Sequence, residues 1–308
     1  MALDASFLGP RNETVYAHKK RWNWIRQHLE QSDRIVELGC GTGCMLTLPL
    51  LKAGFDIIGV DRDESSIAYG RSLAVQVGLS DNSLFLGELA DLPGKYDVVI
   101  ASEVLEHLDE AQLSILLASV YEALRAGGMF LITVPNGFGW YEFESWIWNK
   151  CGLGWLLSRT RLERTLMLFK VWLSGKSEEQ MVEQYPSSLD TSPHVQRFTL
   201  QSLEHRLVES GFHVVEKTGS AIISGQFSNL LFTGYNRLTS LNASLADRMP
   251  ALSSGFYFAC KKDETELSIG TAGARGEGES RMGKVTTEKN EDGRWLPRCS
   301  GLEATRNT

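Results

Sequence analysis

The chain has 308 residues, of which 43% are hydrophobic, and a formal net charge of −7, so it can bury a sizeable core. An acidic chain lacks the basic footprint that phosphate contacts require, which argues against a specific nucleic-acid partner. Its five cysteines are scattered and include no CxxC pair, which argues against a disulfide framework or a thiolate zinc site and favours a reducing compartment.

The N-terminal region, residues 1–33, is expected to hold a loose lead-in followed by a helix from Asn12, its cap, to Gln31. This region has no continuous apolar core of the kind found in a signal peptide. No run in the chain approaches the roughly 18 uninterrupted apolar residues of a membrane span. We therefore expect a cytoplasmic protein.

A glycine-rich turn follows the first predicted strand. The apolar run 34–38 contains Glu37 and opens directly into Gly39, Gly41 and Gly43. This pattern is typical of a buried parallel strand that turns sharply beneath a ligand, because glycine lets the backbone take φ > 0 and approach closely. The spacing is GxGxG rather than GxGxxG, which weakens the case for a pyrophosphate ligand, and a glycine turn without any ligand remains the alternative.

An acid stands at the end of the second predicted strand. The run 56–60 ends at Asp61, which follows Gly43 by 18 residues. A carboxylate at this point of a βαβ unit can accept hydrogen bonds from a ribose diol. The spacing therefore favours a nucleoside ligand.

The central region alternates strands and helices, which predicts a parallel sheet covered on both faces. Gly127 and Gly128 are expected to stop a helix, and Pro135 to end the strand that follows. The further strands are expected at 83–86, 97–101 and 129–134, and the helices at about 43–53, 63–78 and 109–125.

The motifs from the glycine turn to Val104-Leu105-Glu106-His107-Leu108 resemble, in content and order, those of class I S-adenosylmethionine-dependent methyltransferases. The nearest branch is that of the quinone-precursor O-methyltransferases. The resemblance is strong over 12–135 and weak over 194–262. It implies an α/β fold with a seven-stranded, mostly parallel Rossmann-like sheet, helices on both faces and a helical cap insertion.

The same resemblance implies a domain organisation. The last strand, at 255–261, is expected to pair antiparallel between its two neighbours. The segment 220–253 reads as irregular, and the tail is nearly empty of apolar residues, so we expect it to be disordered. The expected parts are an N-terminal helix over the cofactor (1–33), the cofactor-binding core (34–135), an aromatic helical cap (136–193), the C-terminal part of the fold (194–262) and the tail (263–308).

The resemblance also implies which residues bind S-adenosylmethionine. The three glycines would shape the floor of the pocket, Glu37 would engage the methionine amino end, and Asp61 would hold the ribose. Glu88 would accept from the adenine amino group and Leu89 would offer its backbone amide, with Asp91 as the competing acid. The expected cofactor-binding set is Glu37, Gly39, Gly41, Gly43, Asp61, Glu88, Leu89 and Glu103.

Three polar residues, Glu103, Glu106 and His107, follow the fourth strand, at the sheet edge where α/β folds place their ligands. One interpretation is structural, with Glu106 capping the next helix and His107 satisfying a buried backbone group. In a second, His107 is the general base that takes a proton from a hydroxyl acceptor. In a third, suggested by the resemblance, all three share a divalent cation, with Mg²⁺ favoured by the oxygen ligands.

The cap region combines aromatic and basic residues. Within 146–176 the six basic residues outnumber a single Glu163, a local balance of +5. Such a segment favours either a helix lying on an anionic membrane or a packed lid. The six basic residues of 146–176 are Lys150, Arg159, Arg161, Arg164, Lys170 and Lys176.

In similar methyltransferases the segment around His194 and Arg197 covers the acceptor, although a loop histidine is more often solvated.

The favoured function is O-methylation of a small or lipid-linked acceptor. The alternatives are N- or C-methylation of a glycan or natural-product intermediate, and a cofactor-binding module without turnover. Which acceptor is used, and the oligomeric state, do not follow from the sequence.

Overall fold

The computed structural model describes residues 8–10, 12–152, 194–232, 234–262, 286–289 and 295–298, together with positions 155, 159–160, 164–165, 168–169 and 171–172. The chain forms two compact units, Met1–Thr265 and Glu266–Thr308. The first unit contains all the site residues expected from the sequence.

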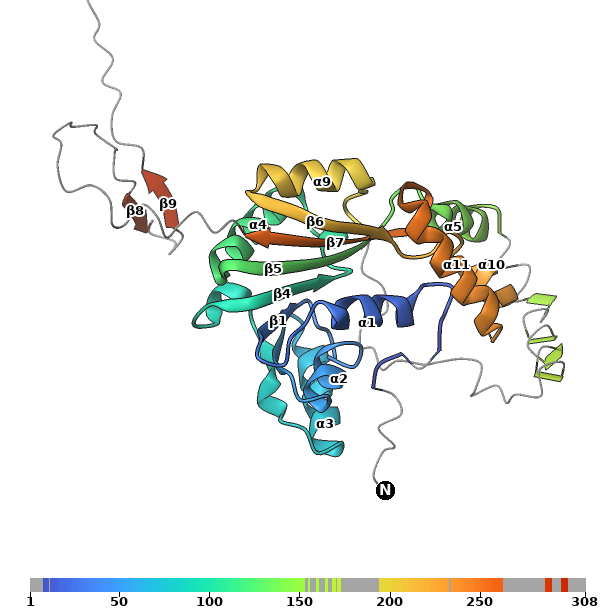
Figure 1. Ribbon diagram of the computed structural model, residues 1–308, viewed down its shortest axis with the longest axis horizontal. Coiled ribbons are helices and arrows are strands. Elements are labelled where there is room, and N and C mark those ends of the chain that lie inside the picture. Colours follow the sequence, from blue (N-terminus) through green and yellow to red (C-terminus); the bar gives the residue numbers. More distant parts are fainter. Residues whose placement is uncertain are drawn as a thin grey trace, which may run out of the picture. The chain divides into compact units, whose positions relative to one another are not determined.

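The first unit is built on one seven-stranded sheet in the order β3-β2-β1-β4-β5-β7-β6 (Figure 1). The five strands from β3 to β5 run parallel, and β7 pairs antiparallel with both β5 and β6. The expected fold class and the antiparallel last strand are thereby confirmed. The strands are β1 (Arg34–Leu38), β2 (Asp56–Asp61), β3 (Leu84–Leu86), β4 (Tyr96–Ser102), β5 (Leu124–Pro135), β6 (Phe212–Gly219) and β7 (Gly255–Lys262).

Helices cover both faces of the sheet. Successive residues of β1 point to opposite faces: Ile35 packs in a cluster with Trp24 of α1, and Val36 in a cluster with Leu113 of α4. Strands buried on both sides in this way read as continuous apolar runs. The helices are α1 (His18–Gln27), α2 (Thr47–Lys52), α3 (Glu64–Gln76), α4 (Glu110–Ala123), α5 (Trp140–Lys150), α9 (Leu200–Glu209), α10 (Gln226–Phe232) and α11 (Asn236–Arg248).

The first helix begins later than the sequence predicts. Ala17 precedes α1 with a left-handed φ of 56°, and no side chain caps it. The Glu13 carboxylate accepts from the backbone N–H groups of Thr14 (3.0 Å) and Lys20 (2.9 Å). The expected cap at Asn12 is therefore wrong, because Glu13 satisfies the helix start from within a turn.

Two further boundaries differ. The helix before β5 ends at Ala123, so Gly127 and Gly128 do not stop it. They lie within β5, where the pairing with β4 shifts register between Tyr96 and Val98. The segment 220–253, expected to be irregular, holds α10 and α11. The buried side of α11 consists of small residues, Thr239, Ala243 and Ala246, whereas its leucines Leu238 and Leu241 are exposed, so apolar spacing does not mark the buried side.

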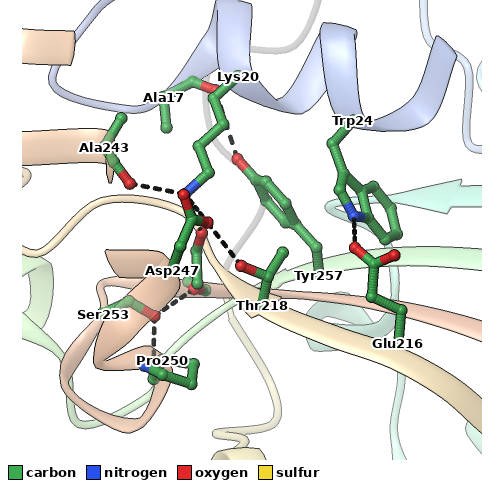
Figure 2. A network of polar contacts seen from close by, with 12 residues as sticks. Ala17, Lys20, Trp24, Glu216, Thr218, Ala243, Asp247, Pro250, Ser253 and Tyr257 are labelled. Atoms are coloured by element: carbon green, nitrogen blue, oxygen red, sulfur yellow. Dashed lines mark hydrogen bonds and ion pairs between the residues drawn. The ribbon is translucent and has the colours of Figure 1, made fainter. Parts of the chain in front are cut away.

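Helix α1 is tied to the C-terminal part of the sheet by the polar network of Figure 2. The Lys20 ammonium donates to the backbone carbonyls of Gly219 (2.7 Å) and Ala243 (2.6 Å) and pairs with Asp247 at 2.6 Å. Trp24 Nε1 donates to Glu216 at 2.7 Å. Residues at the start of α1 are thus held in a fixed place beside β6, β7 and α11.

The second unit contains β8 (Thr286–Lys289) and β9 (Trp295–Arg298), paired antiparallel. The rest of 263–308 lies outside the described residues, so the disorder of the tail stays a prediction. Much of the expected cap, 136–193, is also outside them, apart from α5 and single positions after it. Within the described parts of the chain, no helix is long and apolar enough to cross a membrane.

Candidate functional site

The glycine turn joins the carboxyl end of β1 to the segment before α2. Gly39, Gly41 and Gly43 all have left-handed φ values, of 63°, 54° and 72°, a conformation that strains other residues. A Cβ at Gly39 would lie 2.6 Å from Val104 Cγ2, whereas a Cβ at Gly41 would meet no atom within 4 Å. Gly41 therefore faces open space, and Gly39 is also required by packing.

Asp61, the last residue of β2, fastens this turn. Its Oδ2 accepts from the Gly41 N–H at 2.7 Å, and its Oδ1 accepts from the Asp63 N–H at 2.8 Å. Because β1 and β2 are parallel neighbours, their carboxyl ends bring the glycines and the acid together.

A first cavity of about 280 Å³ opens beside Asp61. Its wall is largely aliphatic and includes Glu88 and Leu89. Glu88 pairs with Arg62 at 2.9 Å, while the competing acid, Asp91, accepts from the Glu88 N–H at 2.8 Å and lies outside this wall. Of the two acids, Glu88 is the one that faces the cavity.

A second cavity, of about 200 Å³, shares Gly39 with the first and is lined by Glu37. The buried Glu37 carboxylate accepts from the N–H (2.9 Å) and the hydroxyl of Thr47, the first residue of α2. Burial raises the pKa of Glu37 to about 7, although the hydrogen bonds from Thr47 oppose this shift. The carboxylate is therefore held beside a cavity by groups that orient it.

A third cavity, of about 390 Å³, shares His18, Arg21 and Glu103 with the second. Burial lowers the pKa of His18 to about 3, so the ring is neutral near pH 7. The three cavities are therefore neighbours in a row, from Asp61 and Glu88 in the first to Tyr141 in the third.

Glu103 lies where the second and third cavities meet. It follows β4 with a φ of 58°, a strained conformation for a residue with a Cβ. Its Oε1 accepts from the Thr133 hydroxyl at 3.0 Å and pairs with Arg21 Nη1 at 3.2 Å. These contacts aim the carboxylate at the cavities.

The structure gathers Glu106 and His107 with His194, and Glu103 is not part of this group. Ligand atoms of the three residues all lie within 4.8 Å of one another. Glu106 is buried and its Oε2 has no partner among the described residues, while burial, reinforced by the charge of Glu103, raises its pKa well above the usual range. The expected set of metal ligands thus differs from the observed cluster by one residue.

Comparison with known proteins shows the family of the chain. The sequence profile of the methyltransferase domain family matches residues 15–217. The chain belongs to the methyltransferase domain family. It is 32% identical over 126 residues to a probable S-adenosylmethionine-dependent methyltransferase of Mycolicibacterium smegmatis (37% of this chain, 46% of that one). It is 33% identical over 105 residues to the ubiquinone biosynthesis O-methyltransferase of Azorhizobium caulinodans (33% and 40%), so it spans less than half the length of these curated relatives.

Solved structures of methyltransferases are also similar. One is a glycopeptide N-methyltransferase, with a TM-score of 0.46 and 16% identity over 83% of this chain and 93% of that one. Another is the magnesium protoporphyrin IX methyltransferase of Synechocystis with bound SAH, with a TM-score of 0.45 and 14% identity over 81% and 83%.

The walls of the cavities in this methyltransferase domain include only some of the residues singled out earlier. His107 is absent from the described walls of all three cavities, whereas His194 lines the third, and the two rings lie 5.3 Å apart. Arg197 lies outside these walls and pairs with Glu142 at 3.5 Å. Tyr16, His18 and Arg21 all line the third cavity.

Several wall residues of the third cavity carry no sequence signal. Tyr141 is one aromatic among many in the cap, and Ser220, Ser224 and Gln226 fall in the segment expected to be irregular. A lone serine or glutamine matches no motif or periodicity, so only the fold reveals its place. For Tyr16, His18 and Arg21 of the same wall there is one indication, because the N-terminal helix is expected to lie over the cofactor.

Proposed function

We propose that this protein is an S-adenosylmethionine-dependent methyltransferase. The observation that carries the proposal is the open, left-handed Gly41 whose N–H is held by Asp61 at the carboxyl edge of the sheet. The adenosine would occupy the first cavity, with Asp61 at the ribose, and Glu88 and the Leu89 N–H at the adenine. The methionine end would extend into the second cavity beside Glu37. The single glycine shared by the two cavities supports this assignment.

The residues between the second and third cavities would do most of the catalytic work. When bound, the cofactor supplies an activated methyl group, so the chain needs no strong nucleophile. His18, Arg21 and Glu103 line both cavities. Their role is to hold the acceptor in line and to exclude water, which is where most of the rate gain of such a transfer arises.

The acceptor would lie in the third cavity and would be O-methylated. His194 lines this cavity, and its ring lies 5.3 Å from that of His107. A proton leaving an acceptor hydroxyl can reach His194 directly and His107 through it. His107 would then act as the base without contacting the acceptor, because the proton would reach it through His194.

The donor set of Glu106, His107 and His194 fits a divalent cation. A buried carboxylate oxygen without a partner and two imidazoles within 4.8 Å offer three ligand atoms. Magnesium, the cation favoured by the oxygen ligands of the expected set, suits this cluster less well, because its two imidazoles favour a transition metal. A cation here would remove the cost of burying Glu106 as a carboxylate. It would also occupy the two imidazoles, so this role is an alternative to their role as bases.

The outer side of the cap supports peripheral membrane contact and a lipid-linked acceptor. Phe143 and Trp146 of α5 are 51% and 57% exposed, and Trp172 is 75% exposed. Lys150 ends α5, and Arg159 lies over the Trp155 ring at 5.8 Å. Exposed aromatics beside basic groups suit an anionic headgroup layer. The rest of the expected 146–176 segment lies outside the described residues.

Titration calorimetry with S-adenosylhomocysteine tests cofactor binding, and formation of this product from S-adenosylmethionine tests turnover. We expect saturable binding to one site. No binding would overturn the proposal. Binding without product across a broad panel of hydroxyl and amine acceptors would indicate the alternative, a cofactor-binding module.

A further inference from the structure

The third cavity differs chemically from the first, and the difference identifies an acceptor class. We propose that the third cavity binds a neutral, multiply hydroxylated ring, a saccharide unit, and presents one of its hydroxyls for methylation. This inference rests on the proposed function, since it names the acceptor of the same site.

The described wall of the third cavity is almost free of aliphatic side chains. The first cavity has Leu38, Val60, Leu89 and Val104 in its wall, whereas Pro135 is the sole aliphatic side chain among the described residues lining the third. An apolar ring would leave a wall group that has no protein partner among the described residues, such as Gln226 Oε1, without one, which is costly. The hydroxyl-bearing residues of this wall are Tyr16, Tyr141, Ser220, Ser224, Ser254 and Tyr257.

The charges of this wall are already matched. Arg21 pairs with Glu103 at 3.2 Å, and His194 Nδ1 lies 3.7 Å from Glu142. His18 is kept neutral by burial, which lowers its pKa to about 3. Among the described residues, the wall therefore offers no unmatched cation to a phosphate or carboxylate, which favours a neutral ligand.

Gln226, the first residue of α10, has a side-chain hydrogen-bond acceptor that lacks a donor. Its Oε1 is buried and has no partner among the described residues, and the residue lines the cavity. A buried acceptor without a partner costs about 1–3 kcal/mol, so a ligand hydroxyl that donates to it gains affinity and orientation.

The distribution of polar groups separates a saccharide from a phenol. A catechol carries its hydroxyls on one edge and needs an apolar slot for the other, whereas a saccharide presents hydroxyls around the whole ring. The polar groups here come from several sides: Tyr16 before α1, Tyr141 on α5, Ser224 and Gln226 near the start of α10, and Ser254 before β7. The Tyr16 and Tyr141 rings lie 6.5 Å apart in an edge arrangement, and Tyr16 also stacks on His18, so aromatic rings on one side of the wall can pack against the C–H groups of a sugar.

The transfer balances with groups already present. A saccharide oxygen forms a bond to the methyl carbon as the carbon–sulfur bond of the donor breaks, and the electron pair stays on sulfur. The hydroxyl proton is released to solvent water, so the step needs no further reactant.

Saturation-transfer NMR on the full chain with excess S-adenosylhomocysteine tests the proposal. The probes are methyl glycosides of common neutral hexoses and 6-deoxyhexoses, with catechol and glucose 6-phosphate for comparison. We expect at least one glycoside to bind and to be methylated when S-adenosylmethionine replaces the product, while the other two probes do not bind. Absence of binding for every glycoside overturns the proposal, whether or not catechol binds.

Gln226→Met is the decisive variant, because it keeps the length of the side chain and removes the acceptor. We expect glycoside affinity to fall about tenfold, as for the loss of one hydrogen bond, with unchanged affinity for S-adenosylhomocysteine. The matched control is Gln27→Met, on the exposed end of α1 outside this cavity. Equal glycoside affinity in wild type and Gln226→Met overturns the proposal, and Ser224→Ala replaces Gln226→Met if thermal unfolding shows that the latter is misfolded.

Failure of the proposed function is recognised separately. If S-adenosylhomocysteine does not bind, that function fails, and the glycosides titrated alone still decide what the cavity accepts.

Discussion

The first and third cavities are built in different ways from the same fold. The first is lined by the carboxyl ends of β1 and β2, by the turn after β3 and by α4. The third draws on the start of α1, the end of β5, α5, His194 and the starts of α10 and β7. The order of strands in the sheet places the first, whereas the third depends also on α5, α10 and the segment around His194. The strand order alone therefore fixes the proposed cofactor end more completely than the proposed acceptor end.

The largest expected effect on the difference between the two cavities comes from a substitution at Gly41, beside the first cavity. We expect Gly41→Val to abolish cofactor binding, a loss of more than about 100-fold or about 2.7 kcal/mol, because a branched side chain would enter the open space beside Asp61. Gly78→Val is the matched control: Gly78 has a φ of 74° and also meets no atom within 4 Å. Both variants should lose similar stability from backbone strain, and only Gly41→Val should lose binding by calorimetry. Retained binding in Gly41→Val would remove the first cavity as the adenosine site.

The cluster of Glu106, His107 and His194 allows a test of whether turnover requires a bound cation. If Glu106, His107 and His194 hold a required cation, turnover should fall to background in chelator and return with an added transition metal such as Mn²⁺ more readily than with Mg²⁺. Glu106→Gln should behave like the chelated enzyme, while Glu122→Gln, on the exposed side of α4, should not. Metal analysis of the purified protein gives an independent readout. Full turnover in excess chelator would leave the histidines as bases only.

Glu37 predicts a pH dependence of stability at the cofactor end. Burial raises its folded pKa from 4.5 to about 7, so between these values the folded state holds a proton that the unfolded state has lost. Stability should therefore be greatest below about pH 4.5 and fall by up to about 3 kcal/mol as pH rises to about 7. Glu37→Gln keeps an acceptor for Thr47 and should lose this part of the slope. Parallel stability curves for both proteins, from denaturant titrations at several pH values, would contradict the assignment.

The sequence predicts the residues around the first cavity better than those around the third. Gly39, Gly41, Gly43 and Asp61 were predicted because strand, turn and acid lie close together in the sequence, and local patterns carry that information. The late start of α1 depends on the Glu13 contact to Lys20, and the buried side of α11 consists of small residues rather than its leucines. Apolar spacing therefore indicates neither feature. His194 joins Glu106 only through folding, since the N–H groups of Val195 and Gln196 donate to the Glu106 carbonyl.

Asp61 has two expected roles, to hold the ribose and to fasten the glycine turn, and one substitution removes both. Asp61→Ala should weaken cofactor binding by about 1–3 kcal/mol, through lost hydrogen bonds to the ribose and a loosened Gly41 N–H. Asp63→Ala is the control, since its carboxylate accepts from Ser66 N–H at 2.7 Å as the cap of α3. That change should cost about 1 kcal/mol of stability and leave binding intact. Equal affinity of wild type and Asp61→Ala in calorimetry would show that Asp61 only fastens the turn.

The smallest expected effect concerns the outer face of the cap. We expect the protein to sediment with anionic liposomes at low salt and less at high salt, because the attraction between exposed charges is screened within about 10 Å at 0.1 M salt. Lys150→Gln should weaken this binding by about 1 kcal/mol, and the double change Phe143→Ser, Trp146→Ser should reduce it further. The control pair Val75→Ser, Ile115→Ser removes equally exposed apolar groups from α3 and α4. If the two double variants sediment alike, or if wild type does not sediment at low salt, then α5 is a lid on the acceptor cavity and its exposed aromatics do not contact a membrane.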